Sequence, residues 1–128
     1  MFFGMFLISL LMTPIMINSV ADYRLSMNQA YMATIMGFAM VALEATMHPI
    51  PLLGWFIVVG GIIAAVVGYR TQFLVSDREY LHDMIPHHSM AVLTSQARME
   101  RSTNKRVKQL AEQILATQNK EIALMKLL

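Results

Sequence analysis

The hydrophobic pattern changes near residue 70 and divides the chain into two parts. In the first part, apolar residues run almost without interruption over three stretches, about 2–20, 30–47 and 51–69. A helix of 19 residues, the length of the first stretch, is about 28 Å long, close to the thickness of the hydrocarbon core of a bilayer. The pattern therefore predicts a membrane domain over residues 1–70 with three transmembrane helices.

Small residues recur at four-residue spacing inside two of these stretches. One set is Ala33 and Gly37, and the other is Gly60, Ala64 and Gly68. Small side chains at this spacing let the backbones of two membrane helices approach closely. We therefore expect these two faces to pack against neighbouring helices.

After residue 70 the apolar residues recur every three or four positions, as on amphipathic helices. Ser76 and Glu79 form a capping box at the start of the first helix, in which Glu79 is expected to reach back to the Ser76 amide. Residues 101–104 predict a turn that ends in the cap of a second helix. The fold class is therefore all-α, with an antiparallel helical hairpin over residues 71–128 that forms half of a four-helix bundle.

Composition and charge favour a membrane anchor over a soluble domain. Apolar residues make up 56% of the 128 residues and charged residues only 14%, about half the share of an ordinary soluble domain. Residues 1–69 hold one cation and two anions, whereas residues 70–128 hold nine cations and six anions. This excess is too dilute to indicate nucleic acid, and lipid headgroups are the closer partner. The absence of cysteine excludes disulfides, thiolate metal sites and a cysteine nucleophile.

Side chains that bind metals concentrate in one segment, His82-Asp83-Met84-Ile85-Pro86-His87-His88-Ser89-Met90. Pro86 removes one helical hydrogen bond and predicts a kink or a restart of the helix. His87 and His88 project about 100° apart, so one helix cannot easily direct both at one ion. Residues four apart share a face, which pairs Asp83 with His87 and Met84 with His88.

The second predicted helix offers complementary donors in Gln118, Glu121 and Met125. Imidazole and thioether groups without a thiolate suit copper better than a hard cation such as magnesium, and neutral imidazoles also bind zinc. The alternative is that the histidines are solvated or cap a helix, and that the methionines are core residues. On this pattern alone both interpretations stay open.

Two blocks of this tail carry a resemblance to a known family. The first is Asp77-x-x-Tyr80-Leu81-x-x-Met84-Ile85-Pro86-His87-His88-x-Met90-Ala91-Val92, and the second is Leu110-Ala111-x-x-Ile114-x-x-x-Gln118-x-x-Glu121-Ile122-x-x-Met125. Together they resemble the signature of the domain-of-unknown-function 305 family. Its members are similar to ferritin-like helical proteins, and several are associated with copper binding outside the cytoplasm. The front half resembles a membrane-anchored subset with three spans before this domain.

The resemblance implies metal contacts by Met84, His87, His88 and Met125, with Glu121 as a further ligand or as a hydrogen-bond partner of one. We therefore expect a membrane-anchored metal-binding protein that handles copper or confers resistance to it, with zinc as the other candidate ion. The alternative is a structural accessory subunit of a larger membrane complex, with no metal chemistry of its own. In either case we expect a homo-oligomer or a larger assembly to complete the helical bundle.

An enzymatic role has one motif in its favour. Glu79 and His82 form a Glu-x-x-His pair of the kind that di-iron bundles use, but the capping box already accounts for Glu79, and we expect no enzyme. For the membrane orientation, Arg24 and Arg70 favour a cytoplasmic tail, whereas the resemblance favours the outer, periplasm-like side. We expect a multi-pass protein of the cell membrane with its tail on the outer side.

Overall fold

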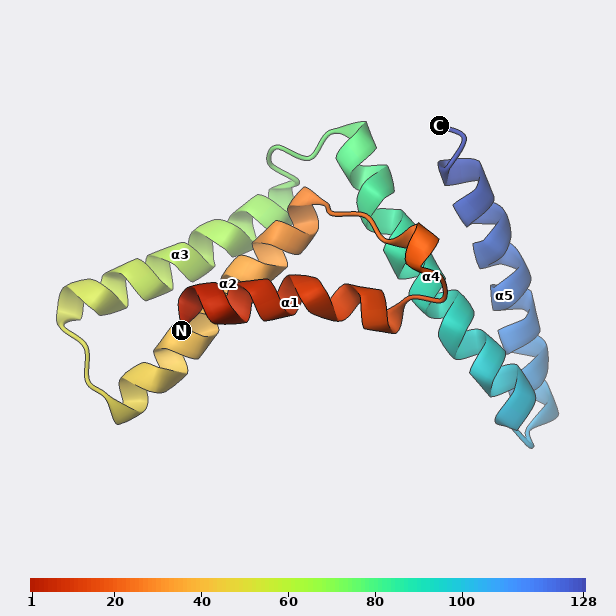
Figure 1. The fold of residues 1–128 in the computed structure, drawn as a ribbon, viewed down its shortest axis with the longest axis horizontal. Helices are drawn as coiled ribbons and strands as arrows, with labels where there is room; N and C mark the ends of the chain where they lie inside the picture. The colour runs from red at the N-terminus through yellow and green to blue at the C-terminus, as the bar shows by residue number, and fades with distance from the viewer. The chain divides into compact units, whose positions relative to one another are not determined.

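The computed structural model describes all residues 1–128, and every regular element in it is a helix. In chain order these are α1 (Phe2–Met16), the short 3-10 helix η1 (Val20–Asp22), α2 (Met27–Met47), α3 (Leu52–Thr71), α4 (Asp77–Arg101) and α5 (Lys105–Met125) (Figure 1). The all-α prediction is confirmed. The chain divides into two compact units, one of Met1–Met12 with Ser26–Glu79 and one of Thr13–Leu25 with Tyr80–Leu128.

Two of the three predicted spans form helices long and apolar enough to cross a membrane, namely α2 and α3. The first predicted span, residues 2–20, forms only the 15-residue α1, which reaches about 22 Å. The chain leaves the helix after Met16, and the Ser19 side chain accepts a hydrogen bond from the Ala21 amide. Such local bonds offer the backbone an alternative to the helical ladder. A third transmembrane helix is therefore not confirmed.

In the first unit, α2 and α3 pack through small residues, but not through all of those predicted. A Cβ added at Gly61 would lie 2.3 Å from the ring of Phe38, and one at Gly68 would also meet a ring closer than side chains normally approach. Gly60 has nothing within 4 Å, and Ala64 is exposed. The packing face of α3 therefore keeps only Gly68 of the three small residues expected there and otherwise runs through Val58, Gly61 and Ala65.

The predicted small face of α2 is where the sequence places it. Ala33 is completely buried. Gly37 lies under an aromatic side chain, since a Cβ there would come within 2.7 Å of the ring of Phe2 in α1. The small residue at position 37 lets α1 approach this face of α2 closely.

The start of α2 and the end of α3 carry polar contacts. The Glu79 carboxylate accepts a hydrogen bond from the Met27 amide at the first turn of α2 (2.8 Å), so the prediction that it returns to the Ser76 amide was wrong. Its negative charge there complements the positive end of the helix dipole. The other half of the capping box is confirmed, because the Ser76 hydroxyl accepts from the Glu79 amide (3.3 Å). Asn28 and Gln72 exchange side-chain hydrogen bonds of 3.3 and 3.2 Å.

In the second unit, α4 and α5 run side by side in opposite directions (Figure 1). The helix α4 continues through Pro86 without the restart that was one of the two expected outcomes. The Asn104 side chain caps α5, as predicted, by accepting from the backbone amides of the second and third helical residues. The two helices share a small apolar core, made of Ile85, Val92 and Ile122 with Leu115 and Met125 packed against it.

Candidate metal centre

Two of the five predicted metal-binding residues come together, His88 of α4 and Glu121 of α5. His88 Nδ1 lies 3.1 Å from Glu121 Oε2, without the angles of a hydrogen bond, so this buried nitrogen has no hydrogen-bond partner. The two side chains are 22% and 44% exposed, which leaves the pair open on one side. A buried imidazole nitrogen without a partner is rare, and it calls for a physical account.

The spacing of this pair fits two donors to a single ion. Metal ions of the zinc type lie about 2.0–2.2 Å from nitrogen and oxygen ligands. Two such donors are about 3.4 Å apart on a tetrahedral ion and about 3.0 Å apart on a square-planar ion such as Cu(II), and the observed separation is 3.1 Å. His88 and Glu121 therefore fit one nitrogen and one oxygen ligand of a shared cation.

The other predicted histidine lies elsewhere. The His87 side chain is 56% exposed, and its Nε2 lies 3.7 Å from the buried carboxylate of Asp83, one turn earlier on the same helix. The neighbouring histidines thus diverge, as the 100° step of a helix requires. The structure separates His87 from the pair formed by His88 and Glu121.

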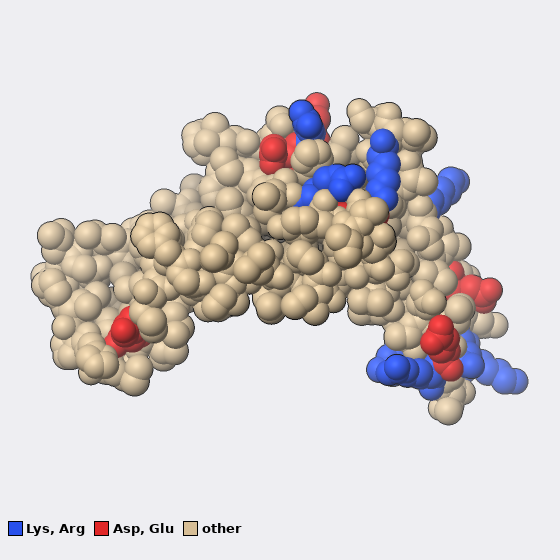
Figure 2. All heavy atoms as spheres, in the orientation of Figure 1, with Lys and Arg blue, Asp and Glu red and all other residues tan.

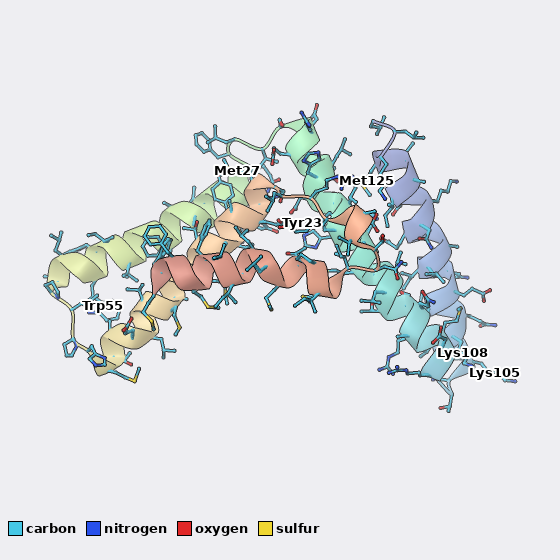
Figure 3. All side chains as sticks on the ribbon, viewed as in Figure 1. Tyr23, Met27, Trp55, Lys105, Lys108 and Met125 are labelled. Carbon is cyan, nitrogen blue, oxygen red and sulfur yellow. The ribbon has the colours of Figure 1, made fainter.

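The two predicted methionines flank that pair, each one turn away on its own helix. Met125 follows Glu121 on α5 and packs against the apolar core of Ile85, Val92 and Ile122, at the end of α5 away from Lys105 and Lys108 (Figure 3). Met84 precedes His88 on α4 and is half-buried. No three histidine or carboxylate side chains of the chain gather as a metal-binding group. A single chain therefore offers one nitrogen donor and one oxygen donor, His88 Nδ1 and Glu121 Oε2. The thioethers of Met84 and Met125 lie one helical turn away along their own helices.

A second polar cluster, which the sequence analysis missed, joins the segment Thr13–Leu25 to the hairpin. The hydroxyl of Ser89, completely buried on α4, donates to Asp22 Oδ2 (2.7 Å) and accepts from the Asn18 amide (2.9 Å). Lys126 donates to the other oxygen of Asp22. The only indication of this cluster in the sequence was that Asp22 is one of just two acidic residues before residue 70.

Electrostatics keep Asp22 ionised. Burial alone would raise the pKa of this carboxyl, but the hydrogen bonds from Lys126 and Ser89 and the positive charges of Lys126 and Arg24 outweigh it. The net result is a pKa below the ordinary value of an aspartate. The cluster is thus a charge-assisted hydrogen-bonded ion pair that holds chain segments together.

Charged side chains gather over the second unit. In Figure 2 the surface of α2 and α3 is almost entirely uncharged, whereas lysine, arginine and acidic side chains lie over α4 and α5. Lys105 and Lys108 project from the first turn of α5, at the turn that joins the two helices (Figure 3). The segregation of charge expected from the sequence is therefore present on the folded surface.

Comparison with known proteins places the helical hairpin in a family. A family model described as Domain of unknown function (DUF305) matches residues 70–128, which hold the whole hairpin. A curated relative, named Uncharacterized protein L153, from Acanthamoeba polyphaga mimivirus, is 38% identical over 109 residues, which cover 82% of this chain and 72% of that protein. No solved structure matches the chain.

Proposed function

We propose that this chain, which belongs to the family described as Domain of unknown function (DUF305), is a membrane-anchored protein that binds copper through His88 and Glu121. The observation that carries the proposal is the buried, unpartnered Nδ1 of His88 at 3.1 Å from a carboxylate oxygen of the neighbouring helix. A nitrogen in this position is satisfied by a cation that it shares with the carboxylate.

The anchor is proposed from the apolar helices α2 and α3. Only 17% of the residues in the apolar window of each helix are buried within the chain, so their side chains need cover from lipid. A helical pair of this kind returns the chain to the side on which it entered. Residues 17–26 and 72–128 would then share one side of the membrane, as the hydrogen bond from Lys126 to Asp22 requires, whereas Phe2 of α1 lies against Gly37 in the middle of α2. We place that side outside the cytoplasm, in keeping with the copper-associated members that the family resemblance suggested.

The choice of ion follows from the donor atoms. Nitrogen and oxygen donors without a thiolate suit oxidised copper, Cu(II), whereas thioethers favour the reduced ion, Cu(I). Met125 is engaged in the apolar core, so the donors that remain accessible are the imidazole and the carboxylate. Zinc accepts the same pair and is the competing ion. When bound, copper would be held and carried at this site, in line with a role in copper handling or resistance.

The two adjacent histidines supply a matched test. We would purify the full chain in detergent and measure Cu(II) and Zn²⁺ binding by equilibrium dialysis for the wild type, His88→Ala and His87→Ala. Because only His88 faces Glu121, we expect His88→Ala to lower the copper affinity by about tenfold or more, with Glu121→Gln close behind. His87→Ala, which removes an exposed side chain, is expected to bind as the wild type does.

Two results would contradict the proposal. The first is equal copper binding by the wild type and His88→Ala. The second is the absence of any copper or zinc binding by the wild type, which would favour the other candidate, a structural accessory subunit that co-purifies with its complex at fixed stoichiometry.

A further inference from the structure

Half of the positive charge of the chain lies at one end of the helical hairpin. Residues 98–108 span the end of α4, the turn and the first turn of α5, and they hold five of the ten lysine and arginine residues but only one acidic residue. All five cations are exposed, and none forms an ion pair with an acid of the chain. We call these five residues the basic tip: Arg98, Arg101, Lys105, Arg106 and Lys108.

The stability of α5 does not account for the cations at its start. The positive end of the helix dipole lies there and favours acidic side chains, but the first turn of α5 has no acidic residue. Lys105 and Lys108, which project at the turn between the two helices (Figure 3), are three residues apart, and like charges at this spacing destabilise a helix. The cations therefore cost stability in the free hairpin, and an anionic surface beside them would offset that cost.

An apolar groove adjoins the basic tip and narrows the choice of anionic partner. It lies between α4 and α5, and Arg98, Val107 and Leu110 are among the residues that line it. Val107 is 40% exposed and Leu110 is 57% exposed. A bare polyanion would meet the cations but leave these two side chains in water. The boundary between lipid headgroups and acyl chains offers anionic and apolar contacts side by side, so a bilayer surface fits both features.

We propose that the basic tip binds the anionic headgroups of the same membrane that holds α2 and α3. This inference rests on the membrane anchor of the proposed function and not on its metal site. Five residues, 72–76, connect α3 to α4, and Glu79 in the first turn of α4 binds the Met27 amide at the start of α2. The helix α4 therefore begins close to the membrane surface.

The length of α4 sets the geometry of this contact. Its 25 residues reach about 37 Å, and the basic tip lies at the far end. Attraction between the tip and the headgroups extends only about 8 Å at physiological ionic strength, so binding requires the hairpin to lie along the surface. The anchor favours this arrangement, because it holds the tip and the headgroups at a high effective concentration.

The test uses the full chain reconstituted in lipid vesicles and labelled in the turn. The chain has no cysteine, so Thr103→Cys, at an exposed position, carries a single fluorophore. The vesicles contain phosphatidylcholine with or without phosphatidylglycerol, together with a lipid that bears a quenching nitroxide on its headgroup. Flotation measures incorporation of the chain, and quenching measures contact between the turn and the headgroups. Both leaflets have the same composition, so either orientation of the chain reports the contact.

The charge variants are matched in net charge and in residue type. The tip variant is Arg106→Gln with Lys108→Gln. The control is Arg78→Gln with Lys120→Gln, which removes the same charges from exposed positions outside the tip. A third variant, Leu110→Gln, keeps every charge and removes an apolar contact. Helical circular dichroism of all three variants checks that they are folded.

We expect quenching of the wild type in vesicles that contain phosphatidylglycerol, and its loss at high salt. The ratio of bound to free tip should fall about fivefold for each cation removed, or about 25-fold in the tip variant. The control should behave as the wild type does, and Leu110→Gln should weaken binding without changing its dependence on salt.

Four results would overturn the inference. No quenching in a chain that floats with the vesicles would exclude the lipid contact and leave the proposed function standing. Equal quenching with and without phosphatidylglycerol, or in the tip variant and the wild type, would show that the cations do not bind headgroups. Quenching only by nitroxide lipids in added, protein-free vesicles would assign the tip to a second membrane. A chain that does not float with the vesicles would overturn the anchor together with this inference.

Discussion

Replacing Ser89 with alanine should detach the segment Thr13–Leu25 from the hairpin. The Ser89 hydroxyl is completely buried and makes two hydrogen bonds, one to the Asp22 carboxylate (2.7 Å) and one from the Asn18 amide (2.9 Å). Alanine fits the same space but removes both bonds. The Asn18 amide is left without a partner, and the Asp22 carboxylate keeps only Lys126.

The size of the effect follows from the two bonds. A hydrogen bond to a charged group contributes about 1.5–3 kcal/mol and a neutral one about 1 kcal/mol. Alanine regains about 0.5 kcal/mol through its higher helix propensity. The free energy of unfolding of the second unit should therefore fall by about 2–3.5 kcal/mol. In a unit of this size each kcal/mol lowers Tm by about 4–8 °C, so the melting transition should move by about 10 °C or more.

Hydrogen exchange of the full chain in detergent measures this effect segment by segment. We expect faster exchange in Thr13–Leu25 and in the middle of α4 for Ser89→Ala, with α2 and α3 unchanged because they belong to the other compact unit. Ser95→Ala is the matched control, since Ser95 is also buried on α4 but lies outside the Asp22 cluster. Unchanged exchange and an unchanged Tm in Ser89→Ala would refute the view that this cluster holds the segment in place.

Three further outcomes follow from the same structure. Because the pKa of Asp22 is lowered in the fold, the ionised carboxylate stabilises the fold fully above the ordinary aspartate pKa, about 4. This stabilisation is lost as the pH falls through the lower pKa of the folded state. Denaturant titrations from pH 6 to pH 2 should show this loss of stability in the wild type and a flatter profile in Asp22→Asn. Glu79→Gln should destabilise the start of α2 by about 1 kcal/mol, seen as faster exchange of its first amides, and an unchanged rate would exclude the cap. Gly61→Ala should weaken α2–α3 packing, since its Cβ would lie 2.3 Å from a ring. Gly60→Ala, in open space, should be neutral or should stabilise the fold by up to about 1 kcal/mol. Equal melting temperatures for the two variants would contradict the assignment of Gly61 to the packing face of α3.

The local features of the helices could be predicted because they depend on neighbours within one turn. The three- and four-residue periodicity located α4 and α5, and the Asn104 cap and the Ser76 hydroxyl act within three residues of themselves. The prediction for Glu79 failed because a distant group competed for its carboxylate. The Met27 amide, 52 residues away, has no partner within its own helix, and it donates to the carboxylate that was assigned to the local box.

The sequence predicted the residue types of the candidate site but not which of those residues meet. Spacing on one helix showed that His87 and His88 diverge, yet it could not show which of them faces the second helix. That depends on the rotation of α4 about its axis, which the burial of Ile85 and Val92 against Ile122 sets. Packing turns His88 toward Glu121 and leaves His87 exposed. The role of Ser89 was likewise hidden, because its partner Asp22 lies 67 residues away.

For this protein, the amino-acid pattern alone determined an all-helical chain, its apolar helices, the separation of charge between its two halves, and the amphipathic hairpin with its concentrated imidazole and thioether groups. Tertiary structure alone decided which face of α3 packs, which histidine meets a carboxylate, and that Asp22, Ser89 and Lys126 form one cluster. The reason is physical. Helix formation and capping are governed by groups a few residues apart, whereas the meeting of donors depends on how whole helices rotate to bury their apolar faces.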